Sequence, residues 1–336
     1  MTNVICSSEI KKESANKKAD KKSLLLDKLA QPGTETQKTD RKNVLKRRAV
    51  AKYITNGIVF PLINLHSSLE KSYWNTAKRC VNELLQNENT IIGRYCNNRW
   101  CIVCNRIRTA RMINDYLPVI KKEIEEPHFV TLTIPNVPGT ELRETITGMT
   151  RTIIKINSTF RHKKEYRLKG IRKLECTYNT TSNDYHPHLH FILAGEKAGQ
   201  ALINTWLHHY PAATRAAQNI KKADEGSLVE LFKYSTKVVT GKNFTKQGNQ
   251  IELKVHPAAL DQIFGAMYGK RVFQAMGIKK LDLSEDIEEI QAQEIEGLVN
   301  AIEIYSWEQE VSDWVSPTGQ LLTGCTANET YKIVKC

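Results

Sequence analysis

Three histidines alternate with other residues in the segment YHPHLHFILAG, residues 185–195. Every second side chain of a β-strand lies on the same face, so His186, His188 and His190 would lie together. Neutral imidazoles bind many divalent metals, and such a group can share an ion while leaving coordination sites open. The ion could polarise a phosphodiester and neutralise the charge that develops on its oxygens. Hydrogen-bonded histidines in a packed sheet are the alternative, but the triplet favours a metal site.

The segment GIRKLECTY, residues 170–178, and the polar turn NTTSND precede the histidines and predict a β-hairpin. If Tyr178 pairs with Tyr185, Glu175 lies opposite His188 on the same face. A shift of one residue would move Glu175 to the other face. A carboxylate beside the imidazoles favours a hard catalytic ion, Mg²⁺ or Mn²⁺.

The segment CNNRWCIVC contains three cysteines at short spacing, Cys96, Cys101 and Cys104. Thiolates bind zinc tetrahedrally, and short loops that carry several of them form small structural zinc modules. Cys80 is the candidate for the fourth ligand, and His66 and His128 are the alternatives. Three buried free thiols are the other interpretation, which the polar, Arg-rich surroundings disfavour.

The net charge of +13 is unevenly distributed along the chain. From Asp282 onward there are 12 acidic residues against Lys332 and Lys335, so the first 281 residues carry +23. Such a charge is expected to attract a polyanion such as nucleic acid, although a generically basic protein is the alternative. The arginines that flank the cysteines are predicted to contact DNA phosphates: Arg94, Arg99, Arg106, Arg108 and Arg111.

The segment ELFKYSTK places Glu230 and Tyr234 four residues apart, on one face of a predicted helix over 227–241. Lys233 and Lys237 flank the tyrosine; Lys237 is a candidate for catalysis and Lys233 for contact with DNA. A phenol has a pKa of about 10 and is a poor nucleophile unless a cation or base assists it. Its attack on a DNA phosphate would conserve the bond energy in a phosphotyrosine. The alternative is structural, with Ser227 and Glu230 forming a capping box and Tyr234 packing against the core.

The periodicity of the sequence predicts the elements that would position these residues. Helices are expected over 66–88, 106–126, 139–166, 200–209 and 256–277, with a further strand over 128–136. We expect four regions: a disordered basic arm (1–50), a helical Cys-rich zinc-binding and DNA-contact region (51–127), a nuclease domain (128–281) and an acidic C-terminal tail (282–336).

The sequence also bears on where the protein acts. No apolar stretch approaches the roughly 20 residues that span a bilayer. The N-terminal segment lacks the continuous apolar run of a secretory signal. Eight cysteines without an export signal favour reduced thiols or metal ligands over disulfides. A cytoplasmic location without membrane partners is expected.

The segments FVTLTIPN, HPHLHFIL and ELFKYSTK, in that order behind a Cys-rich segment, resemble the plasmid rolling-circle replication initiators of the HUH endonuclease superfamily. The similarity covers roughly residues 90–281 and is greatest to the branch with a single catalytic tyrosine and a nearby glutamate. It implies an α+β fold, with a central antiparallel β-sheet and flanking helices, in addition to the small zinc module. One departure is Ile102, where relatives often have proline; the basic arm and the acidic tail are not part of the shared motifs.

The resemblance also implies roles for particular residues. His188 and His190 would be metal ligands. Tyr234 would nick a single strand and remain linked to the 5′ phosphate, which frees a 3′-OH for the host polymerase. Glu230 would activate water to end the round. The implied partners are single-stranded or supercoiled origin DNA, host helicase and host polymerase.

Three other functions remain open from the sequence. A transposase or relaxase would use the same chemistry, and the spacing of the motifs does not separate it from an initiator. A zinc-containing DNA-binding regulator would have structural histidines and would not nick DNA. A metallohydrolase acting on small substrates would leave the basic body and the cysteines without a purpose.

Overall fold

The computed structural model describes the greater part of the chain. The described residues are 37–86, 91–162, 166–224, 226–227, 231, 244–247, 249–279, 281 and 303–336. Residues 45–336 form one compact unit, and the described part of the preceding segment, residues 37–44, is helical.

A five-stranded antiparallel sheet contains the histidine segment, with strand order β6-β3-β5-β4-β9. Its strands are β3 (Pro127–Thr133), β4 (Gly170–Asn179), β5 (Asp184–Ala194), β6 (Asn219–Lys222) and β9 (Phe273–Met276). Strands β4 and β5 form the predicted hairpin. Tyr178 pairs with Tyr185, and Glu175 pairs with His188, which confirms the predicted register.

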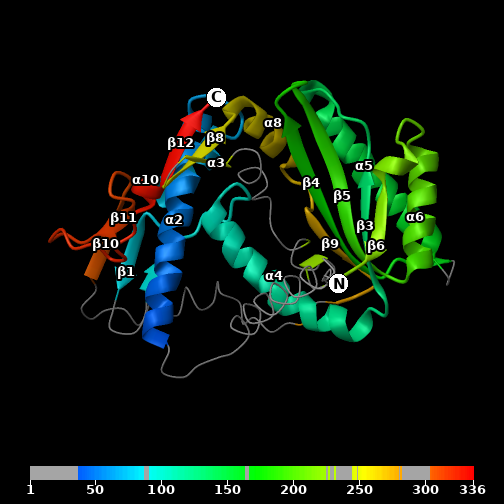
Figure 1. The fold of residues 1–336 in the computed structure, drawn as a ribbon, viewed down its shortest axis with the longest axis horizontal. Helices are drawn as coiled ribbons and strands as arrows, with labels where there is room; N and C mark the ends of the chain where they lie inside the picture. Colours follow the sequence, from blue (N-terminus) through cyan, green and yellow to red (C-terminus); the bar gives the residue numbers. More distant parts are fainter. Residues whose placement is uncertain are drawn as a thin grey trace, which may run out of the picture. The chain divides into compact units, whose positions relative to one another are not determined.

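One face of this sheet packs against two helices, α5 (Gly139–Arg161) and α6 (Glu196–His209) (Figure 1). Apolar residues at helical spacing cover the buried side of α5: Leu142, Ile146, Met149, Ile153, Ile156 and Phe160. In α6, Trp206 is fully buried, and its indole Nε1 donates a hydrogen bond to the backbone oxygen of Thr133 (2.9 Å). Because side chains alternate along a strand, the histidines of β5 lie on the opposite face.

The opposite face has an apolar end and a polar end. Helix α4 (Ile102–Glu123) packs against the apolar end, where Val119 and Ile120 join a buried cluster with residues of β3, β4 and β5, namely Phe129, Ile171 and Ile192. The polar end of this face contains the histidines. These layers confirm the predicted α+β class, with a central antiparallel sheet between helices.

Two smaller sheets accompany the central one. A four-stranded antiparallel sheet has the order β11-β10-β1-β2, and a three-stranded sheet has the order β12-β8-β7, in which β12 is parallel to β8. Their strands are β1 (Glu83–Gln86), β2 (Ile91–Gly93), β7 (Phe244–Gln247), β8 (Gln250–Val255), β10 (Glu303–Glu308), β11 (Asp313–Val315) and β12 (Tyr331–Lys335). The other elements of the described residues are α2 (Gln37–Ile63), α3 (Glu70–Arg79), the 3₁₀ turn η2 (Arg215–Ala217), α8 (Pro257–Met267) and α10 (Ala327–Thr330).

Two regions of the chain differ from the expected arm and tail. Helix α2 begins at Gln37, inside the segment expected to be a disordered arm. Residues 303–336 form strands β10, β11 and β12. In β10, Tyr305 and Trp307 are buried between exposed neighbours, a two-residue alternation that the acidic composition of the segment concealed. Strand β12 also packs closely on α2, since a Cβ at Gly57 would overlap Ile333. The division into four functional regions stays a prediction.

Two expected helices are shorter than the sequence suggested. The helix expected over 66–88 ends at Arg79, because Cys80 is extended and Val81 has a positive φ of 43°, and the chain continues into β1. The helix expected over 256–277 ends at Met267. Gly269 has a φ of +75°, a left-handed conformation that terminates helices, and β9 begins at Phe273.

Candidate metal centres

Glu175, His188 and His190 meet on the polar face of the central sheet. The Glu175 Oε2 atom lies 3.2 Å from the Nε2 atom of His188 and 3.2 Å from that of His190. All three side chains are nearly buried, and their ligand atoms lie within 4.8 Å of one another. An octahedral ion with ligands at about 2.1 Å separates neighbouring ligand atoms by about 3 Å. The carboxylate oxygen therefore lies from each imidazole nitrogen at about the distance of neighbouring ligands of one such ion.

The hydrogen bonds of the two histidines orient them as ligands. The Nδ1 atom of His188 lies 3.0 Å from the backbone oxygen of His186, which can only accept, so this nitrogen carries the proton. A hydrogen bond from Nε2 to the Glu175 carboxylate then requires a second ring proton, and a bound cation would take the place of that proton. The Nδ1 atom of His190 is fixed in turn by Thr131 Oγ1 at 3.0 Å, the kind of outer contact that orients metal-binding histidines.

Lys173 is part of the same group and was missed by the sequence analysis. Its side chain is fully buried, and its Nζ atom forms a short ion pair with Oε1 of Glu175. Burial alone would raise the pKa of Glu175, but its hydrogen bonds with the two histidines and the charge of Lys173 lower that pKa far below its usual value. Glu175 is thus a carboxylate, as a metal ligand must be. The available signal was the two-residue spacing of Lys173 and Glu175, which places both on one strand face.

His186 is not brought into this group. Its Nδ1 atom pairs with Oδ1 of Asn136 at 2.8 Å, and its ring stacks beside that of His188 with centroids 5.2 Å apart. Burial, and then the nearby His188, lower the pKa of His186. Its role as a ligand stays a prediction.

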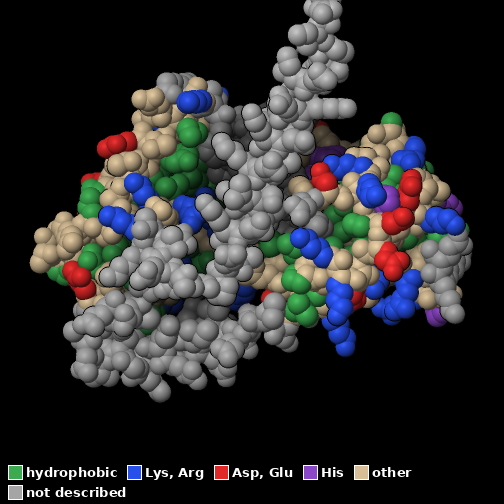
Figure 2. Space-filling view, turned by 60° about the horizontal axis from the view of Figure 1, so that its bottom comes forward, with side chains coloured by type: hydrophobic (Ala, Val, Ile, Leu, Met, Phe, Trp, Pro, Cys, Tyr) green, Lys and Arg blue, Asp and Glu red, His purple; other side chains and the backbone are tan. Residues whose placement is uncertain are grey.

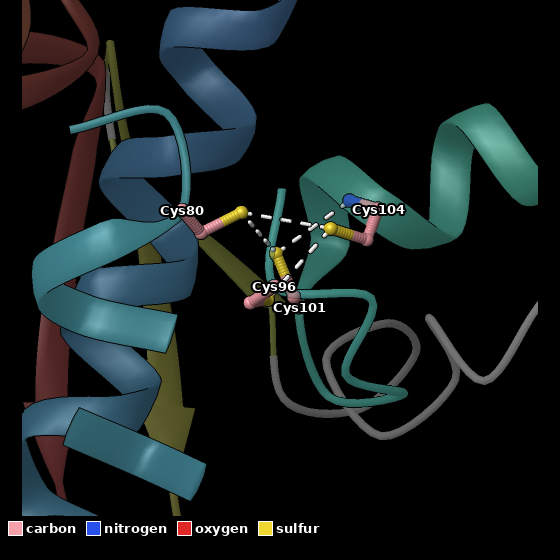
Figure 3. A group of neighbouring side chains, drawn as sticks. All are labelled: Cys80, Cys96, Cys101 and Cys104. Atoms are coloured by element: carbon pink, nitrogen blue, oxygen red, sulfur yellow. Dashed lines mark hydrogen bonds between the residues drawn. The ribbon is translucent and has the colours of Figure 1, made fainter. Parts of the chain in front are cut away.

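The second group consists of Cys80, Cys96, Cys101 and Cys104 (Figure 3). Their sulfurs point toward one another, and the Sγ atom of Cys80 lies 3.5 Å from those of Cys101 and Cys104. The Cys96 and Cys104 sulfurs are 3.7 Å apart. A tetrahedral zinc with bonds of about 2.3 Å separates its sulfurs by about 3.8 Å, so the four residues fit that ion. Neither His66 nor His128 joins them: His66 pairs with Glu70, and His128 with the backbone oxygen of Glu126.

Local structure explains how the cysteines come together. Cys101 is the N-cap of α4, and its sulfur accepts a hydrogen bond from the backbone N–H of Cys104 (3.5 Å) in the first turn. The positive end of a helix dipole favours thiolates at both positions. Cys80 is the C-cap residue of α3, so its side chain reaches the cluster from the end of that helix.

Charge around the cysteines also fits a metal. Hydrogen bonds with Cys101 and then Cys104 lower the pKa of Cys96 far below the usual thiol value, while burial raises the pKa of Cys101. Lys52 is fully buried, and its Nζ atom donates to the backbone oxygen of Ala77 (2.9 Å). Burial lowers the pKa of Lys52, and the four sulfurs oppose that shift. A buried ammonium beside four thiol groups matches the net negative charge of a tetrathiolate zinc site.

The predicted DNA-contacting arginines are only partly accounted for by the fold. Arg94 is exposed. Arg99, Arg106 and Arg108 each donate to a backbone oxygen, of Met267, Arg47 and Asn97 respectively. On the face drawn in Figure 2, Lys and Arg side chains are interspersed with Asp and Glu and do not gather in one patch. Contacts of these arginines with DNA stay a prediction.

The predicted nucleophilic segment lies outside the described residues. This applies to Glu230, Lys233, Tyr234 and Lys237. Their predicted roles stay proposals.

Among the helices that the structure describes, none combines the length and apolarity needed to cross a bilayer.

The fold and the two groups define a class of protein with two parts. One part is an antiparallel sheet that carries a three-ligand histidine–carboxylate group on one face. The other is a module with four clustered cysteines. A family model described as "Replication protein" matches residues 88–198, which include three of the four cysteines and the whole β4–β5 hairpin.

Curated relatives agree with this match. Each is named "Protein rep": one from Streptococcus pneumoniae is 26% identical over 167 residues, covering 43% of this chain and 52% of the relative. One from Staphylococcus aureus is 30% identical over 175 residues, covering 47% of this chain and 76% of the relative. One from Lentilactobacillus hilgardii is 30% identical over 106 residues, covering 30% and 32%. The chain belongs to this replication protein family. It spans about half the length of the Streptococcus pneumoniae relative, and no solved structure matches it.

Proposed function

We propose that this protein initiates rolling-circle replication of a plasmid by nicking one strand of the origin. The Tyr234 oxygen attacks the scissile phosphorus, and the bond from phosphorus to the 3′ oxygen breaks. The tyrosine loses its proton, and the departing 3′ oxygen gains one. The 5′ phosphate remains on the protein, and host helicase and polymerase use the freed 3′-OH. A transposase or relaxase would share this chemistry, and membership of a replication protein family favours the initiator.

The main support is that Oε2 of Glu175 and the Nε2 atoms of His188 and His190 meet in one nearly buried group, with ligand atoms within 4.8 Å of one another. These residues would hold Mg²⁺ or Mn²⁺, which when bound supplies charge neutralisation for the phosphate oxygens. Thr131 fixes the ring of His190. Lys173 holds the second oxygen of Glu175, so the carboxylate presents Oε2 to the ion.

Roles for the nucleophilic segment rest on its sequence. Lys237 would assist ionisation of the Tyr234 phenol by its charge, and Lys233 would contact the DNA. Glu230, one helical turn away, would act as the general base that directs water at the phosphotyrosine and ends the round. The four cysteines would hold a structural zinc, and the basic body would bind single-stranded and supercoiled origin DNA.

A nicking assay on supercoiled DNA carrying the origin tests this proposal, with and without added Mn²⁺. His190→Ala is expected to abolish nicking and to leave DNA binding within about threefold of the wild-type affinity, because phosphate contacts by the basic body dominate affinity. His208→Ala, an exposed histidine at the end of α6, is the matched control and should nick normally. If wild-type protein binds the origin but does not nick it with any divalent metal, the regulator interpretation is correct instead.

A further inference from the structure

A cavity of about 310 Å³ lies beside the Glu175 group. Three parts of the chain form its walls: the cysteine loop, the middle of β4, and the end of α8 with the turn that follows. The residues that matter for its chemistry are Asn98, Trp100, Glu175, Thr177, Phe264 and Tyr268. Glu175 therefore belongs both to the cavity wall and to the candidate metal group.

The walls are mostly apolar and include aromatic rings. Trp100 and Phe264 both line the cavity, with ring centroids 5.4 Å apart, and Tyr73 packs against Trp100 at 5.1 Å. The indole N–H of Trp100 is already donated to Thr76 Oγ1 (3.0 Å), so toward a ligand this side chain offers its ring. Tyr268 is 55% exposed and lies at the rim.

A few polar groups are fixed at the edge of the cavity. The Nδ2 group of Asn98 donates to Ser72 O (3.0 Å) and to Thr76 Oγ1 (2.8 Å), so Asn98 can offer its Oδ1 atom as an acceptor. Arg99 ties the cysteine loop to the end of α8 by donating to Met267 O at 3.0 Å. These bonds tie the cysteine loop to α3 and to the end of α8.

The ligand that fits these features is a planar, largely apolar group with hydrogen-bonding edges. The volume is at the lower end of the range for small-molecule pockets, about 300–1,000 Å³. Enzymes that act on one nucleotide of a strand take a base out of the stack and hold it between aromatic or apolar walls, reading its edge with polar groups. Since Glu175 connects the cavity to the candidate metal group, a base in the cavity would belong to a nucleotide next to the phosphate held there.

We propose that this cavity binds one unstacked base of the substrate strand, adjacent to the scissile phosphate, and so sets a sequence preference at that position. The proposal rests on the proposed function for its substrate. It also gives the cysteine module a purpose beyond stability, because Trp100 and Asn98 lie in the loop between Cys96 and Cys101. The four cysteines fix the loop, and the loop forms one wall of the base pocket.

The test uses the full chain with zinc retained, and a single-stranded oligonucleotide selected for binding from a random pool without added divalent metal. Copies of that oligonucleotide each carry one abasic site, scanned along its length. Thr177→Phe is the blocking variant: Thr177 is half-buried, lines the cavity, and lies in a strand that accepts aromatic residues. Tyr268→Ala removes the rim, and Trp74→Ala, another exposed aromatic outside the cavity, is the control.

Stacking of one base on aromatic side chains is worth about 5- to 150-fold in affinity. Thr177→Phe is expected to weaken binding of the intact strand by a factor in that range, and Tyr268→Ala by less, while Trp74→Ala has no effect. At one position an abasic site should weaken the wild type similarly and remove the difference between the wild type and Thr177→Phe. Unchanged Mn²⁺ binding and thermal unfolding by the variants would show that the metal group and fold are intact.

Two outcomes would contradict the proposed base pocket. In the first, no abasic position changes the difference in affinity between the wild type and either variant. In the second, the variants lose affinity equally for every strand. Nicking by the wild type is scored separately with Mn²⁺. Normal nicking without coupling would reject the base pocket alone, and coupling without nicking would reject the nicking function while supporting the pocket.

Discussion

Lys173→Met isolates the buried charge pair behind the candidate catalytic ion. The Lys173 side chain is fully buried, and Glu175 is 5% exposed. Removing one partner of a buried ion pair costs about 3–5 kcal/mol, because the other charge is left without full compensation. The methylene stem is largely kept by methionine, so the loss reports the charge. We expect the free energy of unfolding to fall by about that amount when no divalent ion is added.

An ion at Glu175, His188 and His190 should reverse part of this loss. The cation would take the place of the lysine as the counter-charge of the carboxylate. If half of the lost free energy returns on binding, about 1.5–2.5 kcal/mol, the variant binds Mn²⁺ more than about tenfold tighter than the wild type. By linkage, saturating Mn²⁺ stabilises the variant by the same additional amount.

Urea unfolding followed by circular dichroism, with and without Mn²⁺, measures the stability terms, and calorimetry measures Mn²⁺ affinity. The matched control is Lys169→Met. Lys169 pairs with Glu123 at 3.4 Å, but the two side chains are 37% and 42% exposed, so this pair contributes at most about 1 kcal/mol. Equal losses for the two variants would refute the buried-pair argument. An unchanged Mn²⁺ affinity in Lys173→Met would refute the placement of the ion at Glu175.

Three further predictions follow from the site. Purified protein should hold about one zinc per chain by elemental analysis; Cys104→Ser should lose it, whereas Cys325→Ser, a buried thiol outside the cluster, should keep it. Zinc retained by Cys104→Ser would refute the four-cysteine site. Tyr234→Phe should abolish the covalent adduct with origin DNA, while Glu230→Ala should form the adduct and fail to hydrolyse it. If Glu230→Ala instead weakens adduct formation and hydrolysis together and lowers the free energy of unfolding by about 0.5–2 kcal/mol, Glu230 has a capping role. The logarithm of single-strand affinity should fall with log salt by about 0.7 per phosphate contact, and a flat response would contradict the polyanion interpretation.

The hairpin was predictable from sequence because two independent patterns agreed on it. A two-residue alternation gave the face of His188 and His190. The polar turn allowed the pairing of Tyr178 with Tyr185, and the structure shows that this register, which places Glu175 opposite His188, is the one formed. Once the register is known, the metal group follows from strand geometry alone. The cysteine cluster was predictable for a similar reason, since thiols at short spacing have few other uses in a polar loop.

Residues whose roles depend on distant contacts were not predictable in the same way. Lys52 becomes a counter-charge for the cysteines only because α2 brings it to them, 28 residues before Cys80 in the sequence. The strands of residues 303–336 were concealed because net charge averages over both faces of a strand. The buried residues Tyr305 and Trp307 contribute nothing to that average. Helix ends were misplaced where a single backbone conformation decided them, as at Gly269.

The two groups of ligands differ in the one property that separates structural from catalytic metal sites. The cysteines would supply four ligands, which would complete a tetrahedron and leave no position for a substrate. Glu175, His188 and His190 supply three, and a six-coordinate ion held there would have positions left for phosphate oxygens and water. The cavity wall shared by Glu175 and the cysteine loop connects the groups, so the closed site can shape the surroundings of the open one. Loss of zinc should therefore alter which strand is bound before it alters the binding of Mn²⁺.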